Sequence, residues 1–109
     1  MEEMLALAPR MCAALQDTEE YKTYCREREI IGADEDLTLR LYRFRKRAAA
    51  FRQSDSPALD DEKEVAAMYH ELRRNPHVRS MFDAESAIVS AVMQAFEMVC
   101  EAGDLEIVM

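Results

Sequence analysis

Residues 75–103 read NPHVRSMFDAESAIVSAVMQAFEMVCEAG, and this stretch decides the fold. Asn75 is a good N-cap, Pro76 suits the first helical position, and Gly103 suits a helix end. Between them, apolar residues recur at steps of three and four, as on one face of an α-helix. The pattern predicts a continuous helix over 76–102, about 40 Å long. A chain of 109 residues has few other elements to cover such a helix. We therefore expect part of its apolar seam to face another copy or another protein.

Capping residues and apolar stripes predict further helices along the rest of the chain. The expected segments are 2–16 with a kink or restart at Pro9, a helix from Thr18 to near Gly32, 35–53, and 58–74. Short loops between the last three helices favour antiparallel neighbours. We predict a single all-α domain over 1–109, an antiparallel helical bundle or hairpin of about five helices. The helices after Gly32 should form its core, with the first two packed across it, and the long C-terminal helix should mediate dimerisation.

Composition narrows the class of protein. The net charge of −8 argues against direct nucleic-acid binding, because phosphates require a cationic surface. The acidic start is unlike a signal peptide, and no apolar run approaches the roughly 20 residues of a membrane span. We expect a cytoplasmic protein without direct membrane insertion. Cys12, Cys25 and Cys100 show no close pair, which favours free thiols over a disulfide framework or a metal site.

No motif for catalysis or cofactor binding is found. His70-Glu71 begins like a zinc-protease motif, but Arg74 stands where the second histidine is needed. The two glycines form no phosphate-binding loop, and no serine lies in a nucleophile motif. We therefore predict a protein that is not an enzyme, with no metal and no cofactor.

The long helix provides the candidate residues for core packing and self-association. These are Val78, Phe82, Glu85, Val89, Val92 and Phe96. Glu85 is unusual because it falls within the apolar stripe. It could pair with a basic residue across an interface, set the pairing register, or lie at an exposed edge of the seam.

A basic run precedes the loop at 53–57. Six basic residues and no acid occur between Arg40 and Arg52. One interpretation is local complementarity, because the next helix begins with several carboxylates and would lie beside the run in a hairpin. The other is a docking patch for an acidic partner or RNA, for which Tyr42, Arg43 and Arg47 are the candidate residues.

Several stretches, taken in order, resemble the YlbF/YmcA family of small helical bacterial proteins. They are TEEYKTY at 18–24, the acidic break at 34–36, LYRF at 41–44 and MYHELRRNPHV at 68–78. The resemblance continues through Ala84-Glu85 and the final helix, and covers roughly residues 4–103. It implies an all-helical protein that self-associates and binds other proteins.

Characterised relatives act with a further protein as accessory factors for the membrane-tethered endoribonuclease RNase Y. Through mRNA maturation they influence competence, sporulation and biofilm formation. Some relatives carry a cysteine-rich tail, and their complex is associated with iron–sulfur clusters; this sequence shows no such tail. We therefore expect a non-enzymatic adaptor that forms a homodimer through the long C-terminal helix and binds a regulatory protein partner. The alternative is a structural or chaperone-like helical oligomer whose methionine-rich groove holds other segments.

Overall fold

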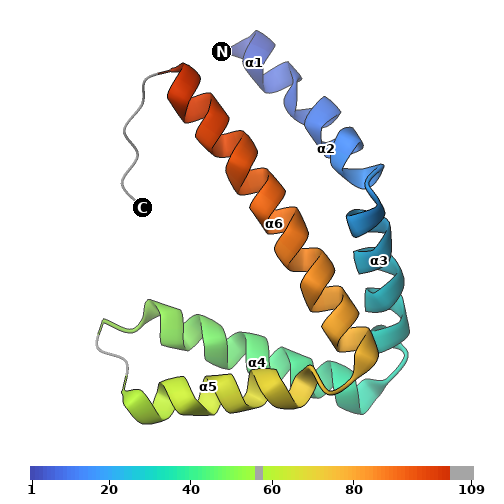
Figure 1. Cartoon of the computed structure of the whole chain (residues 1–109), viewed down its shortest axis with the longest axis vertical. Coiled ribbons are helices and arrows are strands. Elements are labelled where there is room, and N and C mark those ends of the chain that lie inside the picture. Colours follow the sequence, from blue (N-terminus) through green and yellow to red (C-terminus); the bar gives the residue numbers. More distant parts are fainter. Residues whose placement is uncertain (56–57, 104–109) are drawn as a thin grey trace.

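The computed structural model describes residues 1–55 and 58–103, and this part of the chain is all α-helical (Figure 1). The helices are α1 (Glu2–Ala6), α2 (Ala8–Gln16), α3 (Glu19–Gly32), α4 (Glu35–Gln53), α5 (Leu59–Leu72) and α6 (Pro76–Ala102). The all-α class is confirmed, and the expected helix bounds hold to within two residues. The restart expected at Pro9 is a break at Leu7, which leaves the proline at the start of α2. The apolar tail at 104–109 lies outside the described residues.

The predicted caps explain where three helices begin. The Thr18 hydroxyl accepts a hydrogen bond from the Tyr21 amide at 3.2 Å, and the Asp34 carboxylate accepts one from α4. The Asn75 side chain accepts from the amides of His77 and Val78. Each cap satisfies backbone donors that the first turn of a helix leaves without partners.

The core lies at one elbow, where four helices meet. Its buried apolar residues are Ile31 of α3, Leu37 of α4, Leu72 of α5, and Val78, Met81 and Phe82 of α6. The Phe82 ring extends this core toward the hairpin, because it lies 5.9 Å from the ring of Phe44 and stacks on Tyr69 at 5.5 Å. Each large buried side chain contributes about 1.5–3 kcal/mol. The elbow therefore fixes the relative positions of the helices.

The helices do not form the compact core that the sequence suggested. The first part of α6 lies along α3. The α4–α5 hairpin meets α6 at the elbow and diverges from it from there on (Figure 1). One physical reason for this open arrangement is the basic run on α4, because its guanidinium and ammonium groups must stay in water or pair with carboxylates. The radius of gyration is 17.2 Å. A compact chain of this length would have about 13 Å. The protomer is therefore open.

Candidate self-association and docking surfaces

The predicted association residues of α6 divide into a buried and an exposed group. Val78 is 0% and Phe82 is 6% exposed, so both belong to the core at the elbow. Val89 is 55%, Val92 51% and Phe96 39% exposed. Val89 and Phe96 follow Phe82 by seven and fourteen residues, which places all three near one face of the helix. The exposed residues therefore extend the core face of α6 into solvent.

Glu85 forms an ion pair within its own chain. Its carboxylate accepts hydrogen bonds from the Arg45 guanidinium of α4, at 2.9 and 3.4 Å. The same guanidinium lies 5.8 Å from the centre of the Phe82 ring. In the protomer, therefore, Glu85 pairs with a basic residue of α4 and lies at the edge of the apolar stripe of α6. Its location at the last covered turn makes it the boundary between the buried and exposed parts of the stripe.

An aromatic groove opens where the hairpin meets α6. Its volume is about 210 Å³. The groove is lined by Phe44, Ala48 and Tyr69 of the hairpin and by Phe82 of α6, with Arg45, Arg52, Glu85 and Ser86 completing its wall. Val89 begins the next turn of α6 on the same face. The exposed stripe therefore begins one turn beyond the groove, whose wall is partly charged.

Half of the six basic residues in the run on α4 pair with carboxylates in the described part of the chain. The guanidinium of Arg47 donates to Asp61 at 2.7 Å and to Glu64 at 2.8 Å, both on α5. The hydrogen bond to Glu64 is the main cause that raises the pKa of Arg47, and the charges of Glu64 and Asp61 raise it further. These bonds are the local complementarity considered from the sequence. Arg47 therefore links α4 to α5 in this structure.

Two predicted docking residues remain accessible on α4. Tyr42 is exposed, as is Arg43, which forms no ion pair with any residue in 1–55 or 58–103. Arg43 and Arg40 border a small groove of about 230 Å³, whose other lining residues are Met68, Glu71 and Leu72 of α5. The lining of the groove is mostly apolar and carries two guanidinium groups and the carboxylate of Glu71. Such a surface suits an aliphatic side chain flanked by carboxylates.

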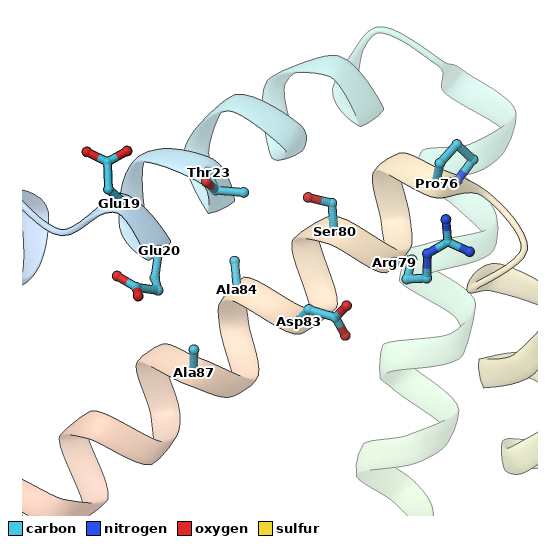
Figure 2. A pocket seen from close by; sticks show the side chains of 9 residues that line it. All are labelled: Glu19, Glu20, Thr23, Pro76, Arg79, Ser80, Asp83, Ala84 and Ala87. Atoms are coloured by element: carbon cyan, nitrogen blue, oxygen red, sulfur yellow. The ribbon is translucent and has the colours of Figure 1, made fainter.

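A larger, shallow groove of about 520 Å³ lies between α3 and α6 (Figure 2). Ala84 and Ala87 of α6 face α3 and form its floor, while Glu20 stands at the rim (Figure 2). Asp83 is also on the rim, but its carboxylate is engaged by Arg73 at 2.9 Å. The small side chains explain the hollow, because they leave the two helices without interlocking bulk.

One polar contact links α3 and α6 that the sequence did not reveal. The Nδ1 atom of His77 lies 2.6 Å from the carboxylate of Glu27, which is 8% exposed. The two residues are 50 positions apart, so no local pattern connects them. The sequence also gave little weight to Met93, although its spacing of four from Val89 places it on the exposed stripe. Within the described residues, no group of three or more His, Cys, Asp or Glu side chains is arranged to hold a metal ion.

Comparison with protein families identifies the family of this chain. A family model described as "Control of competence regulator ComK, YlbF/YmcA" matches residues 4–102. The chain belongs to the YlbF/YmcA family. No curated protein and no solved structure matches it. The family match confirms the resemblance drawn from the sequence, and its description is that of a regulatory factor.

All of the surfaces described above lie within the YlbF/YmcA match. The match begins in α1 and ends at the last residue of α6. In the described part of this family member, none of the helices has both the length and the apolar character that crossing a membrane requires.

Proposed function

We propose that this chain is a non-enzymatic regulatory adaptor that acts by protein association. The single observation that supports the proposal is the exposed stripe of α6, formed by Val89, Val92, Met93 and Phe96. These side chains lie near one face of α6, next to the aromatic groove, and are not scattered singly. Contiguous exposed apolar surface of this kind typically marks a protein interaction site.

Self-association is the first activity we infer from this stripe. The core of the protomer consists of a few buried residues at one elbow. Small domains bury a limited fraction of their surface, and oligomerisation commonly supplies the rest. A homodimer that covers the stripe would remove its valine, methionine and phenylalanine side chains from water. The favourable free energy of that burial is the reason to expect the dimer.

The second activity is docking of a regulatory protein on α4. We infer a partner with an acidic, partly aliphatic surface, because Tyr42 and Arg43 lie exposed beside the small groove at Met68. Arg47 was also a candidate from the sequence, but its bonds to α5 support a structural role instead. Binding of both a second copy and a partner would make the chain a connector between proteins.

The cellular setting that we propose follows from the family. The family is described as controlling the competence regulator ComK. We infer that the chain supports RNase Y-dependent mRNA processing, through which competence, sporulation or biofilm formation would change. A strain that lacks this chain should then accumulate uncleaved forms of the transcripts that RNase Y processes. Expression of the parent chain should restore their cleavage. Unchanged transcript ends in the deletion strain would exclude this setting while leaving the association surfaces intact.

A mass measurement with a matched pair of variants tests self-association. At micromolar concentration, light scattering should give a dimer or larger species for the parent chain. Val89→Asp should dissociate it, because a carboxylate at a covered apolar contact loses its hydration. Ser90→Asp introduces the same group one position away, outside the stripe, and should assemble like the parent. A monomeric parent, or a Val89→Asp variant that assembles normally, would refute the proposal.

A chaperone-like oligomer remains the second candidate function. Exposed methionines support it, since Met4 and Met11 near the start of the chain and Met98 on α6 are more than half exposed. Methionine suits adaptable contact surfaces. This candidate predicts that the assembled protein still binds a hydrophobic dye, whereas the adaptor should lose dye binding when it dimerises.

A further inference from the structure

The outer face of α4 carries a row of exposed side chains that faces away from the core. This outer row consists of Leu39, Tyr42, Arg43 and Lys46. Steps of three, one and three residues place all four on one face of the helix. The residues of α4 that pack into the core lie on the opposite face, and they are Leu37, Leu41 and Phe44. The outer row therefore takes no part in holding the protomer together.

The two cations of the outer row differ from their neighbours on α4. Arg40, Arg45 and Arg47 each pair with a carboxylate of the same chain. Arg43 and Lys46 form no ion pair with any residue that the structure describes. Side chains three positions apart are neighbours on a helix, and like charges there repel each other. A carboxylate from outside the protomer would remove that repulsion.

The groove at Met68 adds an apolar contact beside these cations. Its volume is about 230 Å³, and Met68 and Leu72 supply most of its apolar lining. Apolar sites of about 150 Å³ already hold a benzene-sized molecule, so there is room for one aliphatic side chain. The carboxylate of Glu71 on its lining lies 3.4 Å from the guanidinium of Arg74, which offsets its charge. The groove and the outer row meet at Arg43.

This surface is separate from the aromatic groove between the hairpin and α6. The two grooves share no lining residue. A protein that binds the outer row therefore leaves the exposed stripe of α6 free for self-association, as an adaptor requires.

We propose that the outer row and the groove at Met68 bind one acidic amphipathic helix of a partner protein. An aliphatic side chain of that helix enters the groove, and its carboxylates one turn away pair with Arg43 and Lys46. This inference rests on the docking on α4 proposed above and specifies the form of the partner. A helix suits the surface because residues three and four apart on it match the spacing of the outer row. The ring of Tyr42 adds a flat contact that tolerates both apolar and polar neighbours.

The division of roles between charge and apolar contact follows from exposure. Exposed ion pairs orient a partner and speed its association more than they tighten the complex. The aliphatic contact therefore has to supply most of the affinity. RNA is the less suitable ligand, because it has no aliphatic side chain for the groove. Two unpaired cations on a chain of net charge −8 would also neutralise few phosphates.

Binding of a labelled peptide to the full chain tests the proposal. The probe is an alanine-rich helical peptide of about 16 residues, with one leucine and a glutamate four positions to either side of it. Fluorescence anisotropy should show saturable binding to the parent chain. Arg43→Glu should weaken it roughly tenfold or more, because like charges then face each other. Arg10→Glu is the matched control, since Arg10 is also exposed and changes the net charge equally; it should bind like the parent.

A change in the probe tests the groove without altering the protein. Replacing the leucine of the probe by alanine should abolish most of the binding, because the aliphatic contact is lost. Equal binding of the two probes, or equal effects of Arg43→Glu and Arg10→Glu, would overturn the inference. Preferential binding of a labelled oligoadenylate over the glutamate peptide would overturn it in favour of RNA.

Failure of this inference is distinguishable from failure of the proposed docking. A chain that captures a protein from lysate through Arg43 but does not bind the probe would show that the docking stands and that its partner is not an acidic helix. Capture that Arg43→Glu leaves unchanged, together with no binding of the probe, would overturn both. Light scattering of the same chains measures self-association independently of either result.

Discussion

Tyr21 and Cys25 lie one turn apart on α3, and the thiol affects the ionisation of the phenol. A hydrogen bond to Cys25 is the main cause that raises the pKa of Tyr21 above its ordinary value of 10.0, and the negative charge of the thiolate at high pH raises it further. The folded state therefore favours the neutral phenol. Its contribution to stability is present below the ordinary pKa and is lost as the pH rises through the folded-state value.

An alkaline titration checks this interaction. In the parent chain, the tyrosinate absorbance should contain one component with a raised pKa. Cys25→Ala should return that component toward the ordinary value, because both main causes of the shift are removed. Tyr21→Phe should delete the component and leave the other tyrosines unchanged. A titration curve that Cys25→Ala leaves unaltered would show that the thiol does not act on the phenol.

The contact between His77 and Glu27 should stabilise the pairing of α3 with α6. His77→Ala would leave the carboxylate of Glu27, which is 8% exposed, with Arg26 at 4.0 Å as its remaining ion-pair partner. Depriving a buried polar group of its hydrogen bond costs about 1–3 kcal/mol. Urea unfolding should therefore show a loss of that size for His77→Ala and a much smaller one for His70→Ala, whose side chain is exposed. Equal effects of the two variants would exclude a special role for the contact.

At the scale of elements, the α4–α5 hairpin depends on charge pairs that point outward. Arg47→Glu would place a carboxylate opposite Asp61 and Glu64 and should lower the melting temperature by no more than a few degrees, since exposed pairs are weak. The decrease should shrink at high salt, which screens exposed charges. Arg43→Glu is the control, because Arg43 lacks such a partner in the described chain, and its melting temperature should match the parent. Similar losses for both variants would mean that the specific bonds of Arg47 are unimportant.

The helices themselves were predictable because their signals are local. Thr18, Asp34 and Asn75 each act within the next three residues, so the sequence predicts where α3, α4 and α6 begin. The packing of α6 against α3 was not predictable in this way. It depends on contacts such as that of His77 with Glu27, which join distant positions and leave no periodic pattern in one sequence.

The candidate surfaces were partly predictable for the same reason. Helical spacing places Phe82, Val89 and Phe96 on one face, but it does not tell which of them a neighbouring helix covers. Only the position of the hairpin separates the buried Phe82 from the exposed Val89 and Phe96. Likewise, charge alone left Arg43 and Arg47 equivalent, and the structure distinguishes them because Arg47 lies opposite two carboxylates.

At the scale of the whole molecule, an open protomer with a small core should gain stability from its partner copy. Unfolding of a dimer releases two chains, so the melting temperature should rise with protein concentration. Entropies of unfolding typical of domains of this size give an increase of roughly 3 °C for each tenfold rise in concentration. Phe96→Asp should lower the melting temperature and abolish this dependence, because the variant unfolds as a monomer. Ser90→Asp should retain the dependence of the parent. A parent chain whose melting temperature does not change with concentration would mean that its fold needs no second copy, and the stripe on α6 would then require another occupant.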